Sequence, residues 1–286
     1  MYIRKLSLLN FKNIAQADLE LAPGINCFTG RNGAGKTNVI DAVWYLAMCK
    51  SSLAMTDGQS VRHGEEFFLL NGEYLSDGGR HETVTCSFKR NGGKTLKRNG
   101  KEYERLSEHI GAVPTVIVSP ADIFLVSDAA DERRKWLNSF ISQNDREYLN
   151  ALIRYNHALA ERNRLLKQLR SAAQGDLLEV FDMQLEAHGR VIHAKRAETI
   201  EKLGPIVARH YRAISGDREK VELSYRSELN GATFGEVLAA ARDRDIANQF
   251  TTSGVHRDDM VMRIGGYPLK KYGSQGQQKS FLKLFA

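Results

Sequence analysis

The sequence predicts an α/β fold in which a mixed sheet carries a phosphate-binding loop, with an antiparallel β subdomain beside it and an inserted helical arm. Three observations predict this arrangement. Residues 30–37 form a glycine-rich loop pattern, and residues 67–98 alternate between apolar and polar side chains. Residues 131–170 and 176–214 carry apolar side chains at helical spacing.

The glycine-rich loop matches the pattern G-x-x-x-x-G-K-[ST] at every fixed position. Its residues are Gly30, Arg31, Asn32, Gly33, Ala34, Gly35, Lys36 and Thr37. Glycines let such a loop turn tightly and point its N–H groups at phosphate oxygens, and the following helix adds the positive end of its dipole. We expect Lys36 to reach the β- and γ-phosphates and Thr37 to bind Mg²⁺.

The flanks of the loop support a nucleotide site over an incidental glycine-rich turn. Residues 24–29 have the composition of a strand, and residues 38–50 carry an apolar helical face, so strand, loop and helix follow in the required order. Asn38, directly after the loop, joins the candidate nucleotide-binding residues.

Composition indicates an ordinary soluble globular protein of one or two domains, with 286 residues of which 42% are hydrophobic and 26% charged. No signal peptide or membrane-spanning run is evident, so a cytoplasmic location without membrane association is expected. The net charge of +7 is a mild indication of a polyanionic partner. Cys27, Cys49 and Cys86 have no metal-ligand spacing and are interpreted as reduced core thiols.

Several segments have strand patterns. Residues 2–9 and 18–21 are expected to pair as a hairpin, residues 67–74, 82–90 and 94–98 to form antiparallel strands, and residues 114–118 to form a buried strand. The last hairpin carries a basic stripe without acids, composed of Lys89, Arg90, Lys94, Lys97, Arg98 and Lys101. The stripe has two equal interpretations, contact with DNA phosphates or a solvated edge that prevents strand aggregation.

The two helical patterns are separated by residues 171–175 and predict an arm or small helical domain. We divide the chain into residues 1–125, which hold the loop and the antiparallel sheet, the arm at residues 126–216, and residues 217–286. Residues 133–170 contain nine basic and three acidic side chains. A solvated helix face is the default interpretation of this excess, and DNA contact is the alternative.

Two further motifs lie in the last third. Residues 254–259 read GVHRDD, where His256, Asp258 and Asp259 form either a metal cluster or, more commonly, a turn held by local hydrogen bonds, and Arg257 is the residue of interest. Near the end stand Ser274, Gln275, Gly276 and Gln277. A serine and a glycine at a helix N-terminus make an anion site, although the same residues also suit a simple helix cap.

The motifs resemble the RecF family, bacterial DNA-repair ATPases related to SMC and ABC heads. The resemblance rests on residues 10–13 (NFKN), 30–51, 118–122 with 133–137, 254–259 and 272–279 (YGSQGQQK). It implies an ABC-type ATPase head that binds ATP and Mg²⁺. It also implies that Lys12 and Asn13 lie near the nucleotide, whereas without the family Lys12 is simply a solvated turn lysine.

The resemblance implies a mode of action as well. In the family, ATP is enclosed between the phosphate loop of one subunit and the serine motif, here residues 274–277, of the other, so a homodimer forms on ATP binding. The expected partners are DNA at junctions of single and double strands and the recombination mediators RecR and RecO. The expected processes are DNA repair, replication and the SOS response.

The pattern is incomplete at the end of the sequence. No apolar strand ending in Asp-Asp or Asp-Glu follows the serine motif, and in the family that strand supplies the Walker B acid and the catalytic carboxylate. Asp41, Asp57 and Asp122 are wrongly placed to replace them, so no catalytic residue is assigned. We expect this chain to bind ATP without turnover.

Two other classes of function remain open. A P-loop kinase or GTPase would need a lid with catalytic arginines or an N-K-x-D motif, and no N-K-x-D occurs in the sequence. An SMC-like structural head would need a coiled coil of hundreds of residues, where only about eighty are available.

Overall fold

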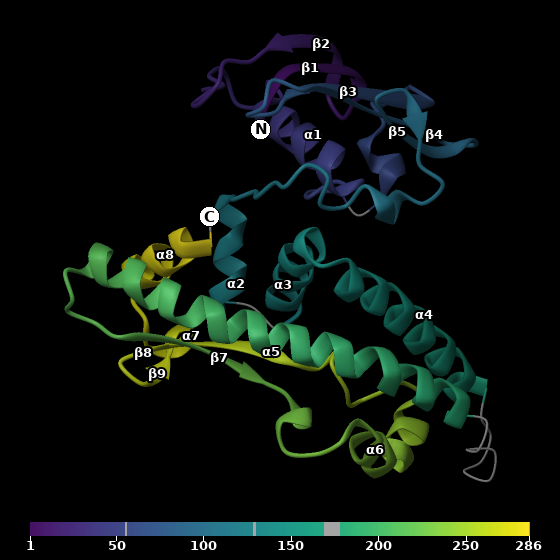
Figure 1. The fold of residues 1–286 in the computed structure, drawn as a ribbon, viewed down its shortest axis with the longest axis vertical. Helices are drawn as coiled ribbons and strands as arrows, with labels where there is room; N and C mark the ends of the chain where they lie inside the picture. The colour runs from purple at the N-terminus through teal and green to yellow at the C-terminus, as the bar shows by residue number, and fades with distance from the viewer. Residues whose placement is uncertain (55, 128–129, 169–177, 286) are drawn as a thin grey trace. The chain divides into compact units, whose positions relative to one another are not determined.

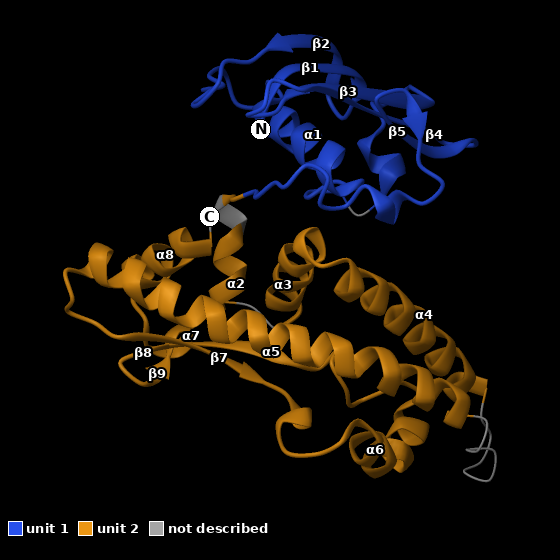
Figure 2. Ribbon diagram, viewed as in Figure 1, with its two compact units in different colours: residues 1–117 blue, residues 118–286 orange. Residues whose placement is uncertain are grey.

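The computed structural model describes residues 1–286 except 55, 128–129, 169–177 and 286. The chain forms two compact units, unit 1 at residues 1–117 and unit 2 at residues 118–286 (Figure 2). The expected arm and the segment after it therefore lie in one compact unit. In the described part of the chain, no helix is long and apolar enough to cross a bilayer.

Unit 1 is a six-stranded antiparallel sheet with one long helix against it (Figure 1). Its strands are β1 (Tyr2–Phe11), β2 (Ile14–Glu20), β3 (Phe67–Leu75), β4 (His81–Lys89), β5 (Gly93–Arg98) and β6 (Lys101–Glu102). They lie in the order β2-β1-β3-β4-β5-β6. The hairpin of β1 and β2 and the strands β3 to β5 confirm the alternating patterns of the sequence.

The helix α1 (Lys36–Met48) covers the apolar face of this sheet. Because side chains alternate along a strand, every second residue faces α1, and Leu6, Leu8 and Phe68 are fully or almost fully buried there. Tyr45 of α1 packs edge-on against Phe68 with ring centroids 5.2 Å apart. This packing fixes the helix that begins directly at the phosphate loop. The short helices η1 (Asp57–Ser60) and η2 (Leu106–Glu108) complete the unit.

Two expected strands are corrected by the structure. Neither residues 24–29 nor residues 114–118 form a strand, and Ile25 is 92% and Val116 58% exposed. A strand persists only when its backbone pairs with a neighbour, and among the described residues no strand pairs with either segment. Cys27 is consequently exposed rather than in the core, whereas Cys49 and Cys86 are free and buried as expected.

Unit 2 is built around three long helices, α3 (Ala130–Asn144), α4 (Arg146–Gln168) and α5 (Glu179–Ser215). The sequence predicted one continuous helical pattern over residues 131–170, but the helix breaks at Asp145. The reason is capping, because the Asp145 carboxylate accepts the N–H of Tyr148 at 2.9 Å and starts α4 there. The predicted break at residues 171–175 and the start at Asp176 lie outside the described residues.

A three-stranded antiparallel sheet packs against α5, formed by β7 (Val221–Arg226), β8 (Asp259–Ile264) and β9 (Tyr267–Pro268). The remaining helices of unit 2 are α2 (Phe124–Ser127), α6 (Phe234–Asn248), α7 (Leu269–Tyr272) and α8 (Gln275–Leu282), with the short helices η3 (Pro120–Ile123), η5 (Glu228–Asn230) and η6 (Lys283–Phe285). Helix α6 starts at a capping box of Thr233 and Glu236. One apolar cluster runs through α3, α4, α5, β7, β8 and α8, which explains why the arm is not a separate unit.

Buried arginines join the elements of unit 2. Arg162 of α4, fully buried, binds Asp182 of α5 and Asp245 of α6, both at 2.6 Å. Arg196 of α5 donates to the Val255 carbonyl at 2.7 Å, and Arg133 of α3 binds Asp259 at 2.6 Å. Buried charges are costly unless paired, so each arginine selects one arrangement of the elements that it joins.

The motif at residues 254–259 is part of this arrangement rather than a metal site. The Nε2 atom of His256 faces the Thr251 carbonyl at 3.0 Å and therefore donates, so Nδ1 accepts from the Tyr155 hydroxyl at 2.8 Å. Burial lowers the pKa of His256 to about 4. Asp258 accepts from Tyr225, and no potential metal cluster exists among the described residues. Arg257 is exposed and lies over the Phe250 ring.

Candidate nucleotide-binding site

The phosphate loop of unit 1 has the backbone of an anion cradle. Gly33 and Gly35 have φ of +81° and +95°, in the left-handed region that favours glycine. A Cβ atom placed at Gly30 or Gly33 would meet nothing within 4 Å, so this side of the loop is open. Helix α1 begins at Lys36 without an acidic residue in its first turn, so its positive dipole end is not neutralised there.

Lys36 is held by the loop itself. Its ammonium group donates to the carbonyls of Gly30 at 2.8 Å and Arg31 at 2.7 Å. Charged phosphate oxygens are stronger acceptors than carbonyls, so they would replace these two partners. Thr37 lies in the first turn of α1, where its hydroxyl can bind a metal ion beside a phosphate.

Asn13 supports the loop from the β1–β2 hairpin. Its amide nitrogen donates to the Gly33 carbonyl at 2.7 Å, and its oxygen accepts from the Asn38 side chain at 2.8 Å. A Cβ atom at Gly35 would come within 2.8 Å of the same oxygen, so this position requires glycine for space as well as for φ. The structure therefore brings Asn13 and Asn38 to the loop, as expected, in supporting positions.

Lys12 contacts a buried carboxylate instead of the loop. Its ammonium group lies 2.6 Å from Asp41 of α1 and 3.2 Å from the Ser51 hydroxyl, and its side chain is only 12% exposed. The alternative of a solvated turn lysine is therefore wrong. Asn10 and Lys12 both have φ near +50°, and backbone bonds to Ser60 and Arg62 hold this corner.

Asp41 is the buried partner of Lys12, and sequence reasoning considered it only as a replacement for the missing Walker B acid. Its side chain is fully buried, and it accepts hydrogen bonds from Lys12, Ser51 and Ser52. Burial alone would raise the pKa of Asp41, but these bonds outweigh it and hold the pKa below its ordinary value of 3.8. The available signal was an acid within an otherwise apolar helix, which usually indicates a buried partner.

The serine motif lies in unit 2 at the N-terminus of α8. Ser274 caps the helix, because its hydroxyl accepts the Gln277 N–H at 3.2 Å and the Gln277 side chain accepts the Ser274 N–H at 2.6 Å. Gln277 also donates to Glu219. Ser274, Gln275 and Gly276 are exposed, so the motif is both a helix cap and an accessible surface.

The basic stripe on β4 and β5 divides between the two faces of the sheet. Lys94 and Arg98 point toward α1, and Lys94 binds Asp57 at 2.8 Å and the Cys49 carbonyl at 2.7 Å. Arg98 binds Glu82. These two residues are therefore not part of an exposed stripe, because alternation along β5 turns them inward. The exposed basic residues are Lys89, Arg90, Lys97 and Lys101.

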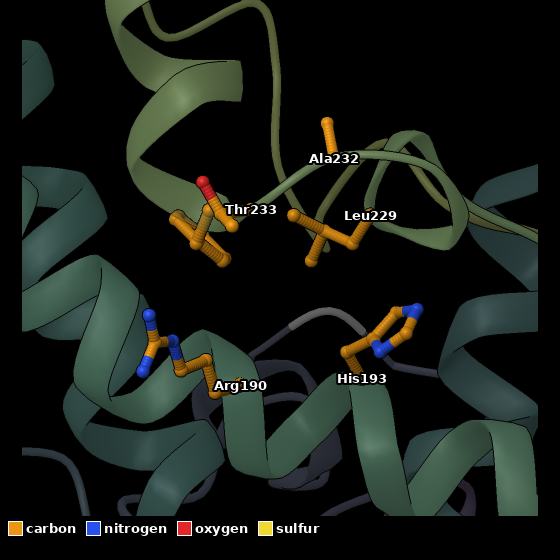
Figure 3. Close-up of a pocket in the computed structure, with 6 residues that line it drawn as sticks. Arg190, His193, Leu229, Ala232 and Thr233 are labelled. Atoms are coloured by element: carbon orange, nitrogen blue, oxygen red, sulfur yellow. The ribbon is translucent and has the colours of Figure 1, made fainter.

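A hollow of about 240 Å³ in unit 2 lies between α5 and the loop before α6 (Figure 3). Arg190 and His193 of α5 face Leu229, Ala232 and Thr233 across it. Arg190 pairs with Glu186, and His193 is bonded to Asn230 at 2.9 Å. The hollow contains no glycine-rich loop, so the phosphate loop remains the candidate nucleotide site.

The ion pair of Lys12 and Asp41 makes the stability of unit 1 depend on pH. Because the pKa of Asp41 is lower in the folded state, its contribution is complete above about pH 4 and is lost as the pH falls through the folded value. At pH 7, Asp41→Asn should lower the free energy of unfolding by about 3 kcal/mol, since it leaves a buried lysine unpaired. Urea unfolding at pH 7 and pH 3 measures both effects.

The difference between wild type and Asp41→Asn should shrink at pH 3. Asp77→Asn is the matched control, because the Asp77 side chain is 94% exposed, and it should unfold like the wild type at both pH values. An Asp41→Asn protein as stable as wild type at pH 7 would contradict the assigned ion pair.

Known proteins resemble this chain over nearly its whole length. A family model described as an AAA domain matches residues 5–224. The chain is 45% identical over 282 residues to the DNA replication and repair protein RecF of Phocaeicola vulgatus, covering 99% of this chain and 76% of that protein. It is 44% identical over 284 residues to RecF of Flavobacterium johnsoniae, covering 99% and 79%.

Solved structures give the same result. The structure of the recombination mediator protein RecF with ATP in the RecFOR pathway superposes with a TM-score of 0.93 at 32% identity, over 99% of this chain and 79% of that one. The Smc head domain of Pyrococcus furiosus superposes with a TM-score of 0.54 at 16% identity, over 99% and 77%, which shows likeness of fold alone. The ABC-type ATPase head predicted from the sequence is thus confirmed, and the chain belongs to the RecF family of DNA replication and repair proteins.

Proposed function

We propose that the chain is an ATP-binding protein of recombinational DNA repair, with the phosphate loop as its nucleotide site. The observation that carries this proposal is the open loop backed by Asn13 and holding Lys36 at the start of α1. Bound nucleotide would place its phosphates against Lys36 and the loop N–H groups, with Mg²⁺ on Thr37. When bound, Mg²⁺ would neutralise phosphate charge. The similarity to a RecF structure with ATP supports this choice of nucleotide.

Dimerisation on ATP is the second part of the proposal. Ser274, Gln275 and Gly276 are exposed at the N-terminus of an eight-residue helix, which favours an anion presented by another molecule. A second subunit would bring its bound nucleotide to this surface. Each dimer would then hold two composite sites, each built from the loop of one subunit and the serine motif of the other.

DNA binding that is independent of sequence is the third part. The exposed residues Lys89, Arg90, Lys97 and Lys101 offer phosphate contacts on β4, on the turn after it, on β5 and on β6 of unit 1. Lys97 lies 3.7 Å from Glu102, a long contact that leaves its charge largely available. Recognition of junctions between single- and double-stranded DNA, and recruitment of RecR and RecO, complete the proposal. Similarity to RecF, a recombination mediator protein of the RecFOR pathway, supports them.

A nucleotide-metabolising enzyme is the alternative function. The exposed serine motif has no role in a P-loop kinase or GTPase, and this observation favours the ATP-dependent dimer. Preference for GTP over ATP in equilibrium binding would favour the alternative.

Nucleotide affinity should depend on Lys36. Lys36→Met removes a charged donor to the phosphates and should weaken ATP binding about ten- to a hundred-fold, measured by titration of fluorescent ATP. Lys50→Met is the matched control, since Lys50 is exposed two residues past the end of α1. Equal affinity of a folded Lys36→Met protein and the wild type would refute the site.

Dimerisation should depend on Ser274 in the other subunit. Ser274→Arg should retain ATP binding but form no ATP-dependent dimer, because its long side chain blocks the partner's phosphate. Light scattering of mixtures tests the composite site. Ser274→Arg mixed with Lys36→Ala should dimerise, since one site of the pair is intact, while each variant alone stays monomeric. Dimers of Ser274→Arg alone would exclude this geometry.

DNA binding should weaken steeply with salt. Reversing the charges of Arg90, Lys97 and Lys101 to Glu should lower the slope of log K against log salt by about two to three units if each contacts a phosphate. Reversal of Arg190, Lys202 and Arg212 on α5 is the control with the same charge change, because all three are solvent-exposed. An unchanged slope in the first variant would place the duplex site elsewhere.

A further inference from the structure

Two tyrosines lie exposed and in mutual contact just before the serine motif. Tyr267 is 61% and Tyr272 56% exposed, yet their ring centroids are 5.1 Å apart and the ring planes are tilted by 49°. Aromatic rings usually stabilise a fold through burial of their surface, and these two exposed rings add little stability in this way. Their mutual contact keeps them together while more than half of each residue remains exposed to solvent.

Backbone structure holds both rings in place. The turn at Gly265 and Gly266, with φ of +55° and +83°, returns the chain so that Tyr267 pairs with Ile264 at the edge of the three-stranded sheet. The next residues form α7, which Leu269 anchors by full burial. Figure 1 shows β9 and α7 next to one another in unit 2. The pair is therefore presented by ordered elements and not by a loose loop.

The chain segment around the pair carries basic side chains and no acidic ones. Residues 260–286 contain no Asp or Glu, and their basic residues are Arg263, Lys270, Lys271, Lys279 and Lys283. Lys270 and Lys271 lie between the tyrosines in the chain and are exposed, and the Lys271 ammonium is 5.5 Å from the Tyr272 ring centroid. Open aromatic faces beside solvated cations suit a ligand that has both flat rings and negative charges.

We infer that Tyr267, Lys270, Lys271 and Tyr272, here called the tyrosine–lysine face, bind single-stranded DNA by stacking unpaired bases on the rings. The lysines would neutralise the phosphates on either side. Only unpaired bases expose their faces for stacking, so this surface selects single strands, whereas lysines alone would accept a duplex equally well. The inference rests on the proposed DNA binding and adds a surface for the unpaired strand.

Comparison of three ligands tests the inference by fluorescence anisotropy at fixed salt: a labelled oligo(dT), an abasic oligomer of the same length, and a duplex. Wild type should bind oligo(dT) more tightly than the abasic strand. Tyr267→Ala with Tyr272→Ala should lose about ten-fold or more in affinity for oligo(dT) and bind it like the abasic strand. Tyr267→Phe with Tyr272→Phe retains both rings and should bind as wild type does.

The charges are tested separately. Lys270→Ala with Lys271→Ala should lower the slope of log K against log salt for oligo(dT) by up to about 1.4 units, at about 0.7 for each phosphate contact. The Tyr267→Ala, Tyr272→Ala variant should keep the wild-type slope. Nucleotide affinity, measured with fluorescent ATP, should be unchanged in all three variants.

The outcomes distinguish this inference from the function on which it rests. Equal affinity of the Tyr267→Ala, Tyr272→Ala variant and wild type for oligo(dT) overturns the inference alone, as does an equal loss of affinity for the abasic strand in this variant. If the Tyr267→Ala, Tyr272→Ala variant loses ATP-dependent dimerisation but binds oligo(dT) as wild type does, the inference is also overturned. The tyrosine–lysine face is then a contact between proteins. A wild-type chain that binds neither single-stranded nor duplex DNA overturns both proposals.

Discussion

Lys12 and Asp41 meet inside unit 1, where burial removes most of the water from both charges, and the position of the phosphate loop depends on this ion pair. The pair ties the corner between β1 and β2 to the middle of α1, the same helix whose first residue is Lys36. The neighbouring residue Asn13 is thereby held against the loop carbonyl of Gly33. Breaking a buried pair is costly because one charge is left unsatisfied, so the corner, the helix and the loop keep one relative position.

Unit 2 is also held together by buried charges, here those of arginine side chains. The planar guanidinium of Arg162 or Arg196 reaches several acceptors at once, so one side chain joins three or four segments. Arg133 of α3 binds Asp259 at the start of β8 and so joins the helices to the sheet. Gln277, which closes the cap of Ser274, also donates to Glu219 and so connects the serine motif to the same unit. The exposed motif therefore stands on a rigid base, which is a requirement for recognition of an anion.

Local patterns in the sequence were sufficient for the phosphate loop and for the hairpins, because each depends on residues close together in the chain. Properties that depend on distant partners were not predictable. Residues 24–29 have strand composition but no strand partner in the described chain, and Asp41 acquires its role only when Lys12, 29 positions earlier, folds against it. Lys94 and Arg98 belong to a basic run by composition, yet the period of the strand turns both inward. Aspartate is a common helix cap, so Asp145 could have been identified as one from its type. Because helix-forming residues lie on both sides of it, the sequence pattern predicted one continuous helix there.

The two carbonyl contacts of the Lys36 ammonium have a consequence for selectivity among small anions. Any ligand must first compensate for the loss of the Gly30 and Arg31 oxygens, which already satisfy the lysine at ordinary hydrogen-bond distances. A single weakly basic anion such as chloride gains little in that exchange. A polyphosphate chain engages the ammonium, several N–H groups and the helix end together, so its contacts reinforce one another once the first has formed. We therefore expect the loop to bind polyphosphates, which offer several oxygens in a row, and to exclude simple ions such as chloride.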